Sequence, residues 1–146
     1  MKKKKKEPVI SKKKIKRMKR SDGLKMKLVD KYTMERVVAG SASRYPKRIA
    51  LRTYAEEGSE LTYSELKRKS DAVSLYFLEQ GFVKGDRIAL IGESCPNWML
   101  AYFGLTGIGL TAVPVLPEFS PKEILHILQD GGVKAVVVNA RHVEKI

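Results

Sequence analysis

Apolar and polar positions along the chain predict helices that alternate with short apolar strands. Residues 34–44 repeat their apolar positions at helical spacing behind Thr33, a residue type that caps helix N-termini. Residues 49–54 alternate apolar and polar side chains, and residues 60–62 can run back after a turn over residues 56–58. These patterns predict a short amphipathic helix followed by a small antiparallel hairpin.

A longer helix is predicted to follow the hairpin. Thr62 and Glu65 have the spacing of a capping box, in which each side chain binds a backbone amide that the first helical turn leaves free. Gly81 can adopt the left-handed conformation that ends a helix. The stripe expected to face the core is Leu66, Val73, Tyr76, Phe77 and Gln80, and the side expected to face water holds Lys67, Arg68 and Lys69.

Three apolar runs downstream have the length and composition of strands that are covered on both faces, as in parallel sheets. These runs are residues 87–91, 110–115 and 135–139. Helices are predicted between them, at residues 97–106 and from Ser120, which begins a second capping box, to the glycines at 131 and 132.

The order of these elements predicts an α/β fold. Right-handed crossovers would place the three strands in part of a doubly wound parallel sheet with flanking helices, and the hairpin would form a small antiparallel pair. Residues 136–138 are three valines, which is a strongly apolar sequence for a strand near a sheet edge. Further chain is therefore expected to complete a larger domain of which this is the first part.

The segment 94–116 has no charged residue and is long enough to be a candidate membrane span. Pro96 and Pro114 interrupt it, with three glycines between them, so it is interpreted as a buried helix and a buried strand. The alternative is a small membrane protein anchored by this segment, which would need detergent for solubility.

The positive charge of the chain is concentrated at its start. The net charge is +13, and residues 1–31 hold 15 basic and 3 acidic residues, while the remainder holds 14 and 13. Because this stretch has no aromatic and few apolar residues, a disordered basic tail over residues 1–31 is expected. A solvated arm is the favoured interpretation; the alternatives are contact with an anionic membrane surface or with nucleic-acid phosphates, without sequence-specific nucleic-acid recognition.

Few residues suggest catalysis. Cys95 is the sole cysteine, so no intrachain disulfide can form and a reducing, cytoplasmic location is expected. It is interpreted as a small filler because the sequence offers no paired base. His126 and His142 lack metal-ligand or carboxylate partners at suitable spacing and are interpreted as surface or core residues. Trp98 and Tyr102, one turn apart, are interpreted as core or interface aromatics.

The glycine-rich stretch Gly104, Gly107 and Gly109 invites comparison with a phosphate-binding loop. Its glycines precede a predicted strand instead of leading from a strand into a helix, so their backbone N–H groups would not converge on a phosphate. Close packing is the favoured interpretation.

Several segments in order resemble the opening of AMP-forming acyl-CoA synthetases, members of the adenylate-forming superfamily. The resemblance covers about residues 33–140, and residues 113–120 are most similar to the long-chain fatty-acid branch. The segments that are similar to this family are residues 61–66, 81–90, 96–104, 107–115 and 123–138.

The resemblance implies a parent enzyme that uses ATP with Mg²⁺ to convert a fatty acid into an acyl-adenylate and then transfers the acyl group to coenzyme A. It also implies that residues 32–146 are the N-terminal portion of an AMP-binding adenylation domain. The family's phosphate loop, ribose-binding acidic residue and catalytic lysine lie C-terminal to the matched region. No catalytic, cofactor-binding or metal-binding residue is therefore assigned, and this chain alone is expected to be inactive and to hold no cofactor.

The alternative from a different class is a non-enzymatic binding or scaffolding module with a basic arm for nucleic acid or anionic membrane. If the parent handles fatty acids, the basic tail would instead hold it peripherally at the anionic surface where its substrate partitions. An exposed apolar flank of an incomplete sheet also predicts self-association.

Overall fold

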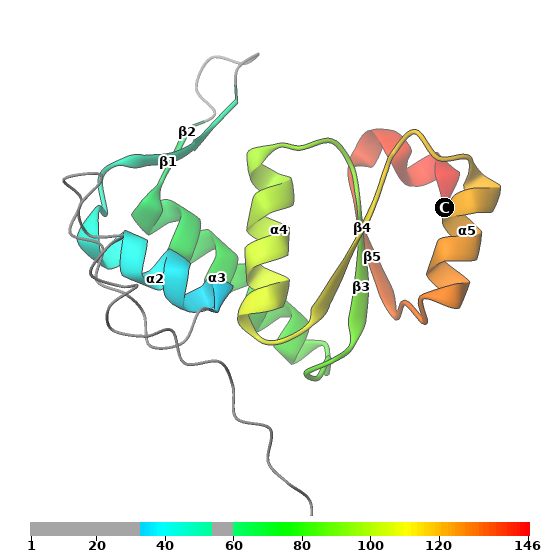
Figure 1. Cartoon of the computed structure of the whole chain (residues 1–146), viewed down its shortest axis with the longest axis horizontal. Helices are drawn as coiled ribbons and strands as arrows, with labels where there is room; N and C mark the ends of the chain where they lie inside the picture. The colour runs from blue at the N-terminus through cyan, green and yellow to red at the C-terminus, as the bar shows by residue number, and fades with distance from the viewer. Residues whose placement is uncertain (1–32, 54–59) are drawn as a thin grey trace, which may run out of the picture. The chain divides into compact units, whose positions relative to one another are not determined.

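The structure is a computed structural model that describes residues 33–53 and 60–146 (Figure 1). The predictions of a disordered tail over residues 1–31 and of a turn at residues 56–58 lie outside the described residues. The described elements are α2 (Met34–Arg44), β1 (Ile49–Arg52), β2 (Glu60–Thr62), α3 (Tyr63–Glu79), β3 (Arg87–Ile91), α4 (Pro96–Gly107), β4 (Thr111–Val115), α5 (Pro121–Asp130), β5 (Ala135–Val138) and the 3₁₀ helix η1 (Ala140–Lys145).

The predicted α/β architecture is confirmed. Strands β1 and β2 form an antiparallel pair, and the three later strands form a parallel sheet in the order β4-β3-β5. The crossover helices α4 and α5 join successive strands of this sheet. The apolar run at residues 87–91 is its central strand, as a strand covered on both faces should be.

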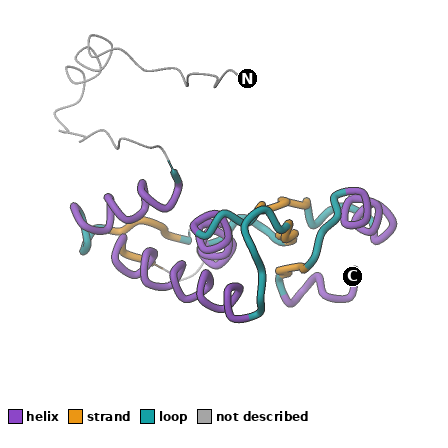
Figure 2. The backbone as a smooth tube through the Cα atoms, turned by 90° about the horizontal axis from the view of Figure 1, so that it is seen from below, coloured by secondary structure: helices purple, strands orange, loops and turns teal. Residues whose placement is uncertain are grey.

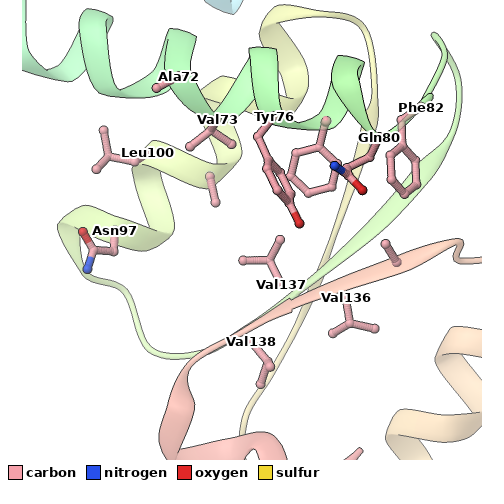
Figure 3. Close-up of a pocket in the computed structure, with 13 residues that line it drawn as sticks. Ala72, Val73, Tyr76, Gln80, Phe82, Asn97, Leu100, Val136, Val137 and Val138 are labelled. Carbon is pink, nitrogen blue, oxygen red and sulfur yellow. The ribbon is translucent and has the colours of Figure 1, made fainter.

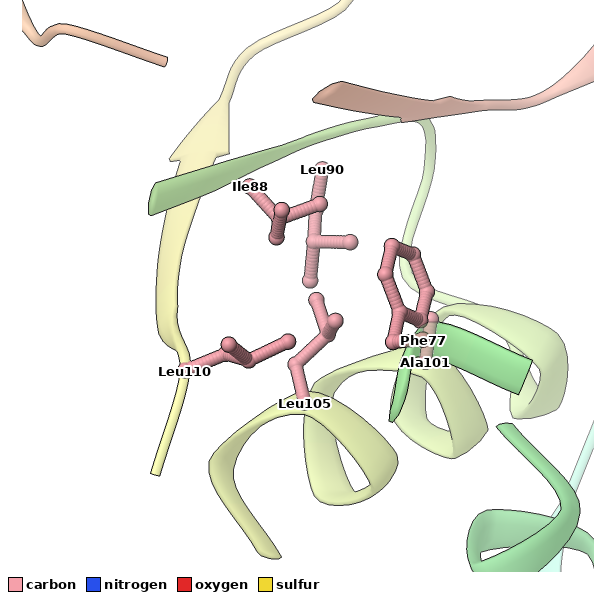
Figure 4. Packing of buried hydrophobic residues seen from close by; sticks show 6 residues of the cluster. All are labelled: Phe77, Ile88, Leu90, Ala101, Leu105 and Leu110. Atoms are coloured by element: carbon pink, nitrogen blue, oxygen red, sulfur yellow. The ribbon is translucent and has the colours of Figure 1, made fainter. Parts of the chain in front are cut away.

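The two faces of the parallel sheet bury different side chains. Ile88 and Leu90 point towards α4 and pack with Leu105, which has no exposed surface (Figure 4). Ala89 and Ile91 point the other way and pack against α5 through Ile124. Figure 2 accordingly shows α2 and α3 on one side of the strands and α5 on the other. The alternation follows from the two-residue period of a strand.

The predicted helix starts are confirmed. The Thr62 backbone N–H donates to Glu65 Oε2 at 2.9 Å, and the Glu65 N–H donates back to Thr62 Oγ1 at 3.3 Å. Ser120 and Glu123 form the same reciprocal box at the start of α5. Helix α3 ends before Gly81, whose φ of 82° is the left-handed conformation that favours glycine.

The stripe predicted for α3 is wrong in part. Tyr76 is 58% exposed and Gln80 is exposed, whereas Ser70 and Ser74 are buried. The two serines are buried because α4 approaches α3 closely here: a Cβ added at Gly104 would lie 2.7 Å from the Val73 side chain. Small serines leave room for this contact, and a pattern based on apolar residues alone does not register them.

The close-packing interpretation of Gly104 is confirmed by this contact. The Ser74 hydroxyl donates to the Gly104 carbonyl at 2.7 Å and so links the two helices directly. Gly109 has a φ of 81° in the turn before β4. These glycines therefore fix the path of the chain between α3, α4 and β4.

The uncharged segment 94–116 divides as predicted into a helix, α4, and a strand, β4. Among the described helices, none combines the length and the apolar character that crossing a membrane requires. The helix η1 was not predicted from the sequence.

Candidate functional site

A cavity of about 340 Å³ lies at the carboxyl ends of β3 and β5. In open parallel sheets this edge is where ligands commonly bind, because the loops after the strands converge there. The loop after β3 and the start of α4 form one side of the cavity, and Asn139 with Ala140 forms the other. Its polar groups come from Glu93, Cys95, Asn97 and Asn139. We refer to this space as the edge cavity.

Close contact between the two loops depends on Gly92. A Cβ at this position would lie 3.2 Å from the Asn139 Cβ, which is tighter than most side-chain contacts. The Asn139 N–H donates to the Ile91 carbonyl at 2.9 Å, and the Asn139 side-chain oxygen accepts from the Arg141 N–H at 3.3 Å. Asn139 thus makes the last backbone contact between β5 and β3 and is also the N-cap of η1.

Glu93 is the centre of a polar cluster beside the edge cavity. Its Oε1 lies 2.9 Å from His142 Nε2 and 3.5 Å from Arg141 Nη1, and its Oε2 accepts from Asn139 Nδ2 at 3.3 Å. The backbone N–H of Glu93, followed by the His142 side chain, holds the pKa of the Glu93 carboxyl below its ordinary value. We refer to these four residues as the Glu93 cluster, and it fastens η1 to the loop after β3.

The cluster contains a pair of residues that spacing along the sequence did not indicate. His142 does have a carboxylate partner, Glu93, which lies 49 residues away in the chain. Local spacing could not reveal this pair; the available signal was that both residues follow strands of the same parallel sheet. His126 is exposed on α5, as the surface interpretation requires.

The other candidate residues have structural surroundings. Cys95 is a free, half-buried thiol at the N-cap of α4, and its side chain forms no capping hydrogen bond. The Trp98 and Tyr102 rings stack with centroids 5.6 Å apart, and both pack against the core. Both rings are half-buried, which agrees with their interpretation as core or interface aromatics.

The described residues do not fit Mg²⁺ or the phosphates of ATP. The carboxylate at the edge cavity, Glu93, is already bound to His142 and Arg141. Over residues 33–53 and 60–146 there is no group of three or more His, Cys, Asp or Glu side chains that could hold a metal ion. Gly104 packs against α3 instead of presenting amides to a ligand. The edge cavity is suited to packing and binding, and nothing in it pairs a nucleophile with a base.

Glu93→Gln is expected to remove a pH-dependent part of the stability. Because the folded-state pKa of Glu93 is lowered, the carboxylate stabilises the fold above its unfolded pKa of about 4.3, and this contribution disappears as the pH falls through the folded pKa. Thermal unfolding between about pH 3 and pH 6 should therefore show a steeper acid loss of Tm for the native chain than for the variant. Parallel pH profiles would contradict this role of Glu93.

The chain is similar in sequence to a known enzyme family and to proteins within it. Residues 23–146 match the family described as AMP-binding enzyme. The chain is 34% identical over 100 residues to a long-chain-fatty-acid–CoA ligase of Escherichia coli O157:H7, over 67% of this chain and 17% of the ligase. It is 31% identical over 105 residues to a mitochondrial medium-chain acyl-CoA ligase of Macaca fascicularis, over 72% of this chain and 17% of that protein.

A solved structure shares the fold. The N-terminal domain of FACL13 from Mycobacterium tuberculosis superposes with a TM-score of 0.73 at 22% identity, over 79% of this chain and 29% of that domain. The chain thus spans about one sixth of the length of the curated relatives it matches, 17% in both cases.

Proposed function

Since the chain belongs to the AMP-binding enzyme family, we propose that it forms the N-terminal portion of the adenylation domain of an ATP-dependent acyl-CoA synthetase acting on fatty acids. Under this proposal residues 32–146 are the folded part and residues 1–31 are a basic tail. The single observation that supports it most is the family match, which spans residues 23–146 and includes every described element.

The proposed parent reaction has two steps. A fatty-acid carboxylate oxygen attacks the α-phosphorus of ATP, and pyrophosphate leaves. The thiol sulfur of coenzyme A then attacks the acyl carbonyl carbon, and AMP leaves with the original carboxylate oxygen. ATP, its Mg²⁺ and coenzyme A are assigned to the parent enzyme, because the chain matches the AMP-binding enzyme family and its relatives are acyl-CoA ligases.

The contribution of this chain to that reaction is structural. The central strand β3 has four buried residues in succession, Ile88–Ile91, with relative exposures of 0–1%. Such burial lets the parallel sheet hold the loops at its carboxyl edge in fixed positions. The Glu93 cluster fixes the two loops that meet at this edge.

A chimera tests the proposed function. In the Escherichia coli O157:H7 ligase, the 100 matched residues are replaced by their counterparts from this chain. The chimera is expected to release pyrophosphate from ATP in a palmitate-dependent manner, whereas the 146-residue chain alone should release none. A well-folded but inactive chimera, or an active isolated chain, would contradict the proposal.

The basic tail supports a second, separable proposal: it holds the parent at anionic membrane surfaces. Each basic residue near such a surface contributes on the order of 1 kcal/mol, and residues 1–31 have a net charge of +12 from 15 basic and 3 acidic residues. The full chain is therefore expected to bind phosphatidylserine vesicles at low salt, and to lose this binding as salt is added.

The matched control replaces the five lysines at positions 2–6 by glutamine in the full chain. Sedimentation with vesicles should show weaker binding of this variant to anionic lipid and no binding of either chain to neutral lipid. Equal binding of the two chains to anionic vesicles at low salt would exclude the proposed role of these lysines.

A further inference from the structure

A cavity of about 440 Å³ lies where α2, α3 and α4 pack together (Figure 1). A Cβ added at Gly107 would lie 3.7 Å from Ser74 Oγ and 4.0 Å from the Glu35 Cβ, so the end of α4 lies against both other helices. This size, with a mostly apolar wall, is typical of small-molecule sites. We refer to this space as the three-helix cavity. Its apolar wall consists of Val38, Leu75, Leu78, Phe103 and Ile108.

A buried hydroxyl without a partner belongs to this cavity. Ser70 lines it and is 3% exposed. Among the buried side-chain nitrogen and oxygen atoms of residues 33–53 and 60–146, Ser70 Oγ alone has no hydrogen-bond partner. One turn later, by contrast, the Ser74 hydroxyl donates to the Gly104 carbonyl at 2.7 Å. An unpaired buried hydroxyl costs free energy, which a polar atom of a bound molecule would recover.

The larger groove beside β5, of about 880 Å³, does not contain such a group. Figure 3 shows Tyr76 and Gln80 of α3 reaching over Val137 of β5 in this groove. Both polar side chains are exposed, so water can satisfy their hydrogen-bonding groups. The unpaired buried hydroxyl therefore distinguishes the three-helix cavity from the larger groove.

The charges at the rim of the three-helix cavity favour a cation. Glu35 lines the rim from the first turn of α2 and is exposed, and no described basic side chain forms an ion pair with it. Lys67, the basic residue of the lining, already pairs with Asp71, with 2.6 Å between Nζ and Oδ2. Helix α4 ends here at Gly107, and the C-terminal end of a helix carries a partial negative charge. The rim therefore has an excess of negative charge.

We propose that the three-helix cavity binds a small primary amine that has an apolar body and a hydroxyl group at its far end. The ammonium group donates to the Glu35 carboxylate beside the end of α4. The apolar body lies against Leu75 and Phe103, and the hydroxyl group pairs with Ser70 Oγ. The cavity shares no lining residue with the edge cavity, so this inference does not depend on the proposed function.

Other occupants fit the three-helix cavity less well. An anion would be repelled by the unpaired Glu35 carboxylate and by the end of α4. A wholly apolar molecule would leave the Ser70 hydroxyl unpaired. A single water molecule would pair with that hydroxyl but would leave the apolar space around it unfilled.

Tyramine is the probe, because its amine and its phenolic hydroxyl lie at opposite ends of an apolar ring. It is titrated into the isotope-labelled 146-residue chain and followed by NMR. Saturable binding with a Kd of about 1 mM or lower is expected, with amide shift changes centred on Ser70, Gly107 and Ile108. Phenethylamine, which has no hydroxyl, should bind about fivefold more weakly. Phloretate, which has a carboxylate in place of the amine, should not bind measurably.

Two substitutions separate the two polar contacts. Ser70→Ala should weaken tyramine binding about fivefold, leave phenethylamine binding unchanged and not lower the Tm, because the hydroxyl is unpaired in the free chain. Glu35→Gln should weaken binding of both amines about threefold, as expected for an exposed ion pair. Glu79→Gln is the matched control, because Glu79 is exposed on α3 and does not line the cavity. It should leave both affinities unchanged, and circular dichroism checks that each variant is folded.

Several results would overturn the inference. Absence of saturable tyramine binding would leave Ser70 Oγ to a water molecule, and shift changes centred on the edge cavity would place the ligand elsewhere. Equal affinities for tyramine and phenethylamine would exclude the contact with Ser70. Phloretate binding as tight as that of tyramine, or equal weakening by Glu35→Gln and Glu79→Gln, would exclude recognition of the amine by Glu35.

Discussion

Gly104→Ala is expected to lower the free energy of unfolding by about 2 kcal/mol, although it adds a single methyl group. The added Cβ would lie 2.7 Å from two atoms of the Val73 side chain and 2.8 Å from the Ser70 carbonyl oxygen. Because one of these neighbours is backbone of a packed helix, α3 and α4 must move apart to accept it. Urea unfolding followed by circular dichroism measures the change.

The matched control for this prediction is Gly40→Ala in α2. Nothing lies within 4 Å of a Cβ added at Gly40, and the residue is exposed. Alanine favours a helix interior over glycine by about 0.8–1.0 kcal/mol, so this variant should be more stable than the native chain. Stabilisation by both substitutions would show that α3 and α4 are not in contact at Gly104.

Leu105→Ala is expected to cost more, about 3–5 kcal/mol of unfolding free energy. Leu105 has no exposed surface and packs between α4 and the sheet against Ile88 and Leu90 (Figure 4). Removing its branched end leaves a cavity that the central strand cannot close, because β3 is held by a partner on each side. Equilibrium unfolding in urea measures the loss.

Leu75→Ala is the matched control, because it is the same substitution at an exposed position. Leu75 is 59% exposed on α3, so its truncation removes little buried surface and should change stability by at most about 0.5 kcal/mol. A similar loss for the two leucines would contradict the assignment of Leu105 to the core.

Much of the fold could be predicted because its signals are local. The boundaries of α2 agree residue for residue with the prediction, since Thr33 caps the helix and accepts from the Arg36 N–H. The apolar strands and both capping boxes could be predicted from the sequence in the same way. Each of these features depends on residues a few positions apart.

The features that could not be predicted from the sequence depend on residues far apart in the chain. Ser70 and Ser74 are buried because Gly104, some thirty positions later, lets α4 approach α3. Glu93 and His142 meet because β3 and β5 are neighbours in the sheet. An apolar periodicity registers neither a small residue at a helix contact nor a polar pair joined by strand order.

The proposed function requires this chain to supply a working scaffold for acyl-CoA synthesis. The most direct measurement is palmitoyl-CoA and AMP formation by the chimera of the Escherichia coli O157:H7 ligase that holds the matched residues of this chain. We expect equal amounts of the two products, formed only when palmitate, ATP and coenzyme A are all present. A chimera that folds like the native ligase but forms neither product would contradict the proposed function.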